Sequence, residues 1–230
     1  MDLERAIRYS FDDQEWAAKL LIAAAVGLFA LFTSPLLIGL VGWAALLGYT
    51  TELIRNVRDH HPTPLPRWDD YGGKIRRGGN VLAAYIVYNL PNAVPVCCFA
   101  LTGTFLSDSF IGSTTGLIVM CCVLPVLLVY NLIIWPMLAL GMGRYAVEDN
   151  IGVFFQFGDL FTTLTANLNV TLQWVLYTFV VSFVMGIVGF IPCVGWAAAV
   201  ALNVAVQGHL TGQLAMVVEG DVKPKRKRAR

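Results

Sequence analysis

Histidine and carboxylate side chains of the kind that bind metal ions occur close together in one polar segment of the chain. Asp59, His60 and His61 are followed by Asp69 and Asp70, and this combination of ligands suits zinc, manganese or iron. Three alternate prolines separate the two groups and favour an extended spacer that keeps them apart. We therefore interpret the segment as a solvated loop, with a metal site or a partner-protein site as alternatives. We predict no metal and no cofactor.

The sequence contains none of the common catalytic motifs. It has no recognisable serine-histidine-aspartate set, no phosphate-binding glycine loop and no HExxH, which are the patterns of the commonest hydrolases and nucleotide-binding enzymes. Asp69, Asp70 or Asp159 could serve an enzyme that acts on lipids, but single carboxylates beside aromatic residues are more often helix caps. We predict that the protein is not an enzyme and has no catalytic residue.

The chain around these residues is apolar enough to lie in lipid. Its 230 residues are 57% hydrophobic and 13% charged, with a mean hydropathy of +0.66, and soluble domains carry about twice that charged fraction. Most of its six apolar windows are long enough to cross a hydrocarbon core of ~30 Å as a helix. We predict an all-α polytopic membrane bundle with six transmembrane helices. The windows are residues 17–33, 36–54, 81–105, 111–141, 168–190 and 192–217.

The basic residues indicate the orientation of these helices. All 16 lysines and arginines lie before or at the start of the first window, where Lys19 stands, between the second and third, after the fourth, or in the tail. Such residues stay on the cytoplasmic side, so we expect both termini in the cytoplasm and a location in the inner (cytoplasmic) membrane. The segment before the first window mixes acids with bases, unlike a cleaved signal, and we expect it to be retained.

The connections on the opposite side are short, near residues 34–35, 107–113 and 189–192, and hold no base. Short connections join neighbouring helix ends, which predicts three antiparallel hairpins at about residues 1–58, 65–147 and 152–218. They would form a single membrane domain of residues 1–218. The sequence VGWAA at 41–45 recurs at 194–198, which indicates an internal repeat, with chance similarity of membrane sequences as the alternative.

Each expected hairpin is preceded by aromatic and acidic residues, most clearly in the stretch LPRWDDYGGKIRRGG at 65–79. Aromatic rings favour the level of the lipid headgroups, and carboxylates stabilise the start of a helix. We therefore predict a short interfacial helix on the cytoplasmic face before each hairpin, with the bases of the 65–79 stretch on lipid phosphates. The predicted interfacial and lipid-contact residues are Trp16, Trp68, Asp69, Asp70, Tyr71, Lys74, Arg76, Arg77, Phe157 and Asp159.

Glycines within and beside the apolar windows predict close helix packing, because small residues let membrane helices approach one another. Asn89 and Asn131 are expected to form hydrogen bonds between helices. The predicted packing glycines are Gly42, Gly48, Gly143, Gly195 and Gly208.

The five cysteines lie in or beside apolar windows. We expect them to be small packing residues, with a buried thiol cluster between the third and fourth windows as the alternative. They are Cys97, Cys98, Cys121, Cys122 and Cys193.

Four prolines break the third and fourth windows, at Pro91, Pro95, Pro125 and Pro136. Broken helices can line substrate sites in transporters, but proline also makes fixed kinks in ordinary membrane helices. We favour the kinks.

Residues 219–230 form a basic cytoplasmic tail, with six lysines and arginines after position 222. A polybasic run after a span is attracted to anionic lipid headgroups. A protein partner and nucleic acid are the alternatives, and we expect no nucleic acid.

Several motifs stand out at and after the end of the second window: Gly48-Tyr49 with LIRNV at 53–57, followed by LPRWDDYG at 65–72. They resemble the glycine-tyrosine pair, arginine-rich helix end and proline-x-tryptophan-aspartate-aspartate run of the prokaryotic membrane family known as domain of unknown function 4013. The opening residues Ser10-Phe11, Trp16 and KLL at 19–21 are also similar, whereas residues 73–75 depart from the family pattern. The resemblance covers nearly the whole chain and implies a multi-span membrane protein without an assigned activity.

Few ionisable side chains lie inside the windows. Apart from Lys19 at the edge of the first window, only Glu52 and His209 qualify, both near the expected cytoplasmic ends, whereas transport pathways usually carry such groups. We therefore predict a structural, scaffold or accessory subunit that forms homo-oligomers or joins a larger membrane complex. A transporter or lipid-handling protein that uses the proline-broken helices is the alternative.

Overall fold

The computed structural model describes residues 1–106, 114 and 119–220, and every regular element in that part of the chain is helical. The prediction of an all-α fold is confirmed. The outer connection expected at 107–113 and residues 221–230 of the basic tail lie outside the described residues. The elements are α1 (Leu3–Asp12), α2 (Trp16–Thr33), a 3-10 turn (Ser34–Leu36), α3 (Gly39–Arg58), α4 (Tyr71–Leu106), a π-helical turn (Val119–Val123), α6 (Leu124–Glu148), a second 3-10 turn (Ile151–Phe155), α7 (Phe157–Ala166), α8 (Leu168–Val188) and α9 (Val194–Gly220).

Six of these helices, α2, α3, α4, α6, α8 and α9, coincide with the six apolar windows. Among the described residues, three stretches are long and apolar enough to cross a membrane: Trp16–Leu36, Cys121–Glu148 and Leu168–Val188. Three of the helices therefore have the length and composition of membrane spans, and the arrangement of six spans stays a prediction.

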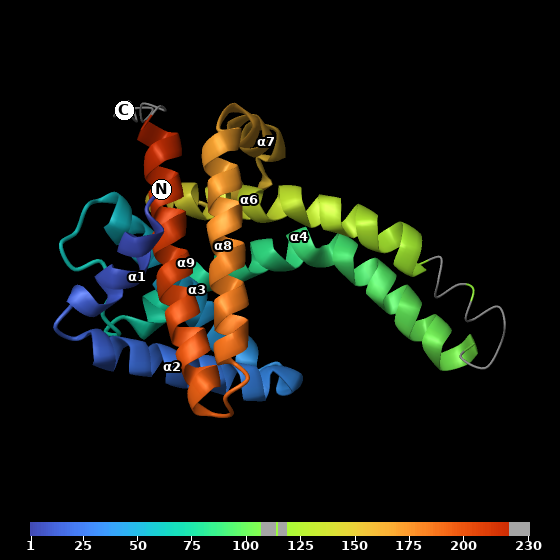
Figure 1. The fold of residues 1–230 in the computed structure, drawn as a ribbon, viewed down its shortest axis with the longest axis horizontal. Helices are drawn as coiled ribbons and strands as arrows, with labels where there is room; N and C mark the ends of the chain where they lie inside the picture. Colours follow the sequence, from blue (N-terminus) through green and yellow to red (C-terminus); the bar gives the residue numbers. More distant parts are fainter. Residues whose placement is uncertain (107–113, 115–118, 221–230) are drawn as a thin grey trace.

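Helix α3 lies at the centre of the fold, where it contacts α2, α4, α6 and α9 (Figure 1). It approaches α4 most closely, because glycines stand where the two backbones cross. A Cβ atom on Gly48 would overlap the backbone carbonyl of Lys74, and one on Gly78 would overlap the carbonyl of Ala44. Neither glycine has a positive φ, so each is required for space and not for backbone freedom.

The five glycines predicted to pack helices each lie against another segment so closely that a Cβ atom would collide. The contacts are Gly42 with Ala30 of α2, Gly48 with Lys74 of α4, Gly143 with Ala215 of α9, Gly195 with Val188 at the end of α8, and Gly208 with Leu53 of α3.

The outer halves of α4 and α6, residues 89–106 and 119–135, extend away from the other helices as a pair, which we call the arm (Figure 1). Pro91 and Pro95 lie inside α4, where α4 bends in Figure 1, because each proline removes a backbone hydrogen bond and its ring displaces the preceding turn. Pro125 lies in the first turn of α6. A helix accepts proline there, so Pro125 does not break α6.

Two asparagines join the helices of the arm. Asn92 and Asn131 exchange two hydrogen bonds of 3.0 Å each between side-chain amides, and the Tyr130 hydroxyl donates to the Tyr88 carbonyl at 2.8 Å. The interhelical bond predicted for Asn131 is confirmed. The prediction for Asn89 is wrong, because its side chain donates to the Tyr85 carbonyl of its own helix and accepts from Asn92.

The cysteines do not pack inside the protein. Cys97, Cys121, Cys122 and Cys193 are exposed, so both the packing role and the buried thiol cluster are wrong for them, and the Cys98 side chain lies outside the described residues.

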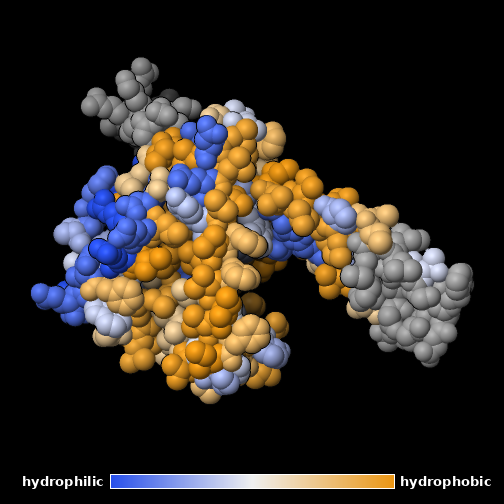
Figure 2. All heavy atoms as spheres, viewed as in Figure 1, coloured by the Kyte–Doolittle hydropathy of each residue, from blue (hydrophilic) through white to orange (hydrophobic). Residues whose placement is uncertain are grey.

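Most of the surface of the protein in the view of Figure 2 is apolar. Hydrophilic residues gather at the end that carries α1 and the loop between α3 and α4 (Figure 2). We call this end the polar end.

Candidate functional site

The stretch 65–79 lies at the polar end and consists of the end of a loop and the first turns of α4. Asp70 caps this helix, because its Oδ1 accepts a hydrogen bond of 2.9 Å from the Gly73 amide, as the sequence predicts for a carboxylate at a helix start. The separate short interfacial helix expected here is not present. Helix α4 continues unbroken from Tyr71 to Leu106, so the stretch forms the start of a long helix.

The Trp68 ring lies inside the protein, where only 8% of it is exposed. It stacks on Tyr49 with the ring centroids 4.7 Å apart, and its Nε1 donates to the Lys19 carbonyl at 3.0 Å. The expectation that Trp68 anchors the chain in lipid headgroups is therefore wrong. An indole has an apolar body and one N–H donor, and here both find partners in the interior.

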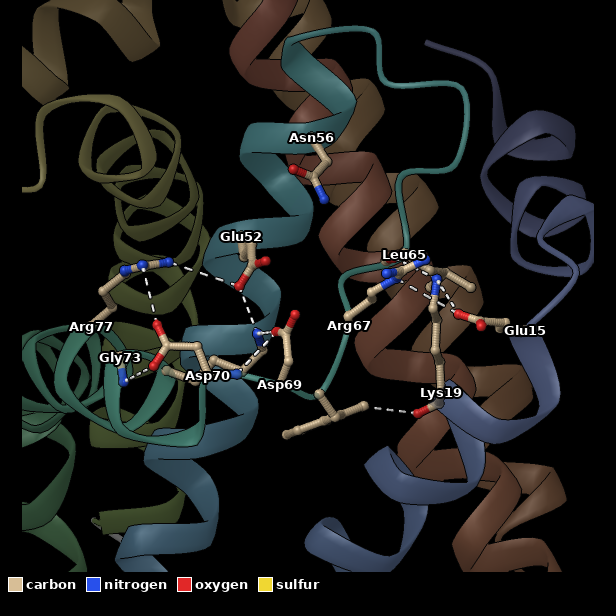
Figure 3. Close-up of polar contacts among 12 residues, drawn as sticks. Glu15, Lys19, Glu52, Asn56, Leu65, Arg67, Asp69, Asp70, Gly73 and Arg77 are labelled. Carbon is tan, nitrogen blue, oxygen red and sulfur yellow. Dashed lines mark hydrogen bonds and ion pairs between the residues drawn. The ribbon is translucent and has the colours of Figure 1, made fainter.

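The Lys74 side chain is fully buried, so the expectation that it meets lipid phosphates is also wrong. Its ammonium lies 2.8 Å from the Glu52 carboxylate and 4.0 Å from that of Asp69 (Figure 3). The crossing of α3 and α4 explains the pairing. The Lys74 backbone rests on Gly48, and Glu52 follows Gly48 by one turn on the same face of α3.

Arg77 adds a second cation to the same carboxylate. Its guanidinium lies 3.8 Å from Glu52 and 3.8 Å from Asp70, and 28% of the side chain is exposed (Figure 3). Arg76 points elsewhere, with 74% of its side chain exposed and a long contact of 3.8 Å to Asp149. Of the three bases predicted to contact lipid, Arg76 is the one that the structure leaves open to the surroundings.

A second buried ion pair lies on the other side of Trp68. The Lys19 ammonium is 2.6 Å from the Asp13 carboxylate and 3.1 Å from the Leu65 carbonyl, while Glu15 contacts Lys19 at 3.9 Å and Arg67 at 3.8 Å. The two lysines therefore connect α2, α3, α4 and the loop. We call the group Asp13, Lys19, Tyr49, Glu52, Trp68 and Lys74 the loop cluster.

Electrostatics keep the Asp13 carboxylate ionised. Burial acts to raise the pKa of Asp13, but the hydrogen bond from Lys19, the backbone N–H of Glu15, and the charges of Lys19 and Arg67 outweigh it, so its pKa lies below the ordinary value. The electrostatic effects that lower the pKa therefore exceed the cost of removing this carboxylate from water.

Sequence reasoning missed Asp13, Lys19, Glu52 and Tyr49 as members of this site. Lys19 carried a signal, since a lysine in the first turn of an apolar helix needs a partner. The partner itself could not be identified without the fold.

The two groups of potential metal ligands have different surroundings, and only the second lies beside the loop cluster. Asp69 and Asp70 contact Lys74 and Arg77, while Asp59 contacts Arg55 at 4.0 Å. No group of three potential ligands that could hold a metal ion occurs in the described part of the chain.

Helix α7 carries the last two predicted interfacial residues. Phe157 is 45% exposed, and Asp159 lies 4.0 Å from Arg144. Arg144 also donates to the Thr163 hydroxyl at 2.7 Å, so this contact fastens α7 to α6. Trp16, at the start of α2, is 38% exposed and Tyr71, at the start of α4, is 48% exposed.

The family described as a protein of unknown function (DUF4013) matches residues 19–194. The chain belongs to the DUF4013 family. The resemblance inferred from the motifs is thereby confirmed, and the matched region begins at Lys19 and includes Glu52, Trp68 and Lys74. No curated protein and no solved structure matches the chain.

In this DUF4013 protein the loop cluster can position helices. Its carboxylates each face a lysine or arginine, and the Trp68 indole bonds to a backbone carbonyl. Such contacts hold α2, α3 and α4 in one register at the polar end, because a misplaced helix would leave a buried charge without a partner.

Proposed function

We propose that this protein is a six-span protein of the inner membrane, with both termini in the cytoplasm, that acts as a structural, scaffold or accessory subunit. It forms homo-oligomers or joins a larger membrane complex through the arm. The proposal includes no reaction, no cofactor and no nucleic acid.

The contacts of the chain start with α8 and α9 support the orientation. The Met1 amino group donates to Gln173 of α8 at 3.3 Å, and the Asp2 backbone pairs with Gln213 of α9. The chain start, the beginning of α8 and the end of α9 therefore lie together. A single leaflet can accommodate all of these segments, as the positive-inside rule requires.

Cysteine labelling tests this orientation in a cysteine-free background. Thr63→Cys lies in the exposed loop after α3, and Ile191→Cys lies in the exposed connection between α8 and α9. An impermeant maleimide should label position 191 in intact cells and position 63 only after the membrane is opened. Labelling of position 63 in intact cells contradicts the six-span arrangement.

The arm is the observation that carries the assembly proposal. Val94 and Val96 of α4 are 63% and 65% exposed, and Val126 and Leu128 of α6 are 67% and 61% exposed. Lipid tolerates such side chains, but packing against another protein helix gains van der Waals contact. Because the arm extends beyond the remaining helices, a second protein can reach both of its sides.

Cross-linking of single cysteines measures this contact. In a cysteine-free background, Val94→Cys or Leu128→Cys should give a cross-linked oligomer in native membranes. Phe183→Cys on α8, 62% exposed, is the matched control away from the arm. Equal cross-linking at all three positions would indicate random collision, and a monomeric mass without co-purifying partner in mild detergent contradicts the proposal.

The bend in α4 supports a second candidate function, a transporter or lipid-handling protein. Pro91 and Pro95 lie in α4 and Pro136 lies in α6, and bent helices line the substrate sites of several transporters. Solute or lipid flux in proteoliposomes that is lost in Pro91→Ala with Pro95→Ala favours this candidate. Unchanged flux in the straightened variant counts against it.

Anionic lipids are the membrane partners that we propose. Arg76 is exposed at the polar end, and the basic residues of the tail follow α9. Each base near an anionic surface contributes about 1 kcal/mol of attraction. Flotation of a peptide of residues 219–230 with anionic vesicles, compared at low and high salt, measures that contribution.

A further inference from the structure

A cavity of about 840 Å³ opens at the polar end between α1, the loop after α3 and the last turns of α9. Arg5 and Tyr9 of α1, His60 of the loop, and His209 and Met216 of α9 line it. Its volume exceeds what a few waters need and lies in the range of small-molecule sites. Neither the loop cluster nor the arm includes these residues.

His209 presents a hydrogen-bond donor whose position the surrounding contacts determine. The Gln213 side chain accepts from the Asp2 amide at 2.7 Å through Oε1 and donates to the Asp2 carbonyl at 2.8 Å through Nε2. These two bonds fix the orientation of the Gln213 amide. The second hydrogen on Gln213 Nε2 therefore faces His209 Nδ1, which lies 3.0 Å from Gln213 Nε2.

The tautomer of His209 follows from this contact. Nδ1 has to accept the hydrogen bond, so the neutral ring carries its proton on Nε2. His209 is 5% exposed, and Tyr9 covers its ring with the centroids 4.2 Å apart. No hydrogen bond within the described residues engages Nε2, and His209 is among the residues that line the cavity.

Arg5 supplies a positive charge beside this donor. Within residues 1–106, 114 and 119–220, no ion pair or hydrogen bond engages its guanidinium, whereas neighbouring Arg8 is paired with Glu4 at 3.1 Å. Arg5 and Asp2 are the two charged residues that act on the His209 ring. Asp2 is already engaged, because its carboxylate caps α1 by accepting from the Arg5 amide at 2.9 Å.

One wall of the cavity is apolar, with Val57 of α3 and Met216 and Val217 of α9. The cavity therefore combines a free guanidinium, a fixed N–H donor and an apolar wall. Three carboxylates also line it: Asp2 caps α1, Glu4 pairs with Arg8, and Asp12 lies at the end of α1. We infer that the cavity binds a phosphate-bearing anion, with the phosphate on Arg5 and the Nε2–H of His209 and the attached organic group against Met216 and Val217. Arginine and N–H donors form strong charge-assisted bonds with phosphate.

Two sources could supply this phosphate, an anionic lipid headgroup or a soluble phosphate ester. The inference goes beyond the proposed assembly function and does not depend on it. Phosphate binding that leaves the oligomeric mass unchanged distinguishes this inference from the proposed assembly function, because assembly is assigned to the arm.

Binding to the full-length protein in neutral nanodiscs tests the inference. Calorimetry measures the binding of glycerol 3-phosphate, the soluble ester. Thermal unfolding in nanodiscs that contain phosphatidic acid in place of phosphatidylcholine measures the stabilisation by the anionic lipid. Saturable binding of the ester assigns the site to soluble phosphates. Stabilisation by phosphatidic acid alone assigns it to a headgroup.

The matched variants are Arg5→Gln and Arg76→Gln, which each remove one exposed arginine charge at the polar end, and of the two only Arg5 lines the cavity. Loss of one charge-assisted contact should weaken binding about tenfold or more in Arg5→Gln, while Arg76→Gln should bind like the natural protein. His209→Asn should also weaken binding. If His209→Asn does not fold, the Arg5→Gln variant still tests the inference. Equal losses in the two arginine variants, or no binding of either probe, overturn the inference.

Discussion

The ammonium of Lys74 lies 2.8 Å from the carboxylate of Glu52, and the Lys74 side chain is fully buried between α3 and α4. A lysine removed from water in this way depends on its partner, because an isolated buried charge loses its hydration without compensation. The pair therefore determines how α4 sits on α3.

Glu52→Gln should lower the free energy of unfolding by about 3 kcal/mol, because it leaves Lys74 buried without a counter-charge. Lys74→Met should cost less, since it removes the buried charge and Glu52 keeps Arg77 within 3.8 Å. Denaturant unfolding in detergent measures both. Arg76→Gln, at a side chain that is 74% exposed, is the control and should change stability by less than about 0.5 kcal/mol. A larger loss in Lys74→Met than in Glu52→Gln would contradict this account.

Gly78→Ala should destabilise the protein by about 1–3 kcal/mol, because its new methyl group would overlap the Ala44 carbonyl of α3. The neighbouring Gly79 is a matched control on the same helix, since a Cβ there meets nothing within 4 Å. Gly79→Ala should be neutral or stabilise α4 by up to about 1 kcal/mol. Thermal unfolding of the two variants side by side makes the comparison. Similar behaviour of both would show that α3 and α4 do not cross at Gly78.

Trp68→Phe should cost about 1 kcal/mol or more, because the ring stays apolar but loses the Nε1 bond to the Lys19 carbonyl. Trp68→Ala should cost about 3–5 kcal/mol, as expected for an aromatic side chain removed from an interior. The control is Trp16→Phe at a ring that is 38% exposed, with an expected change below about 0.5 kcal/mol. Equilibrium unfolding in the same detergent reports all three values. A Trp68→Ala variant that affects membrane insertion but not the free energy of unfolding would support a role of Trp68 as a lipid anchor.

Acid should weaken the ion pair of Asp13 with Lys19. The folded-state pKa of Asp13 lies below its unfolded value, so its contribution to stability is fully present above about pH 4 and is lost as the pH falls through the folded-state pKa. The free energy of unfolding should therefore decrease more steeply below about pH 4 in the natural protein than in Asp13→Asn. Asp12→Asn, one exposed position earlier, is the control and should keep the steep decrease. A natural protein with the same acid slope as Asp13→Asn would refute the pairing.

The helical class and the bounds of some helices followed from local patterns, whereas α4 begins ten residues before its predicted window. The first apolar window, at 17–33, became α2 at Trp16–Thr33, and the fifth, at 168–190, became α8 at Leu168–Val188. Asp70 capped a helix as a carboxylate at that position should. These features depend on residues a few positions apart, which is why sequence reasoning reached them.

The environment of single side chains did not follow from such patterns. Trp68 and Lys74 have the residue types of a membrane surface, yet both are buried because Gly48 lets the start of α4 settle onto α3. The cysteines show the reverse, since apolar windows suggested burial and the structure exposes Cys97 and Cys121. The average hydropathy of an apolar helix does not indicate which of its faces packs against protein.

The amino-acid sequence by itself determined the helical class, the bounds of α2 and α8, the family and the distribution of bases along the chain, because hydropathy, capping and charge act locally. Only the tertiary structure decided that Lys74 pairs with Glu52 and Lys19 with Asp13, and that Arg5 and His209 share a cavity. Those pairings join residues 6 to 204 positions apart, and their geometry depends on where glycine-lined helices cross, which no short stretch of sequence encodes.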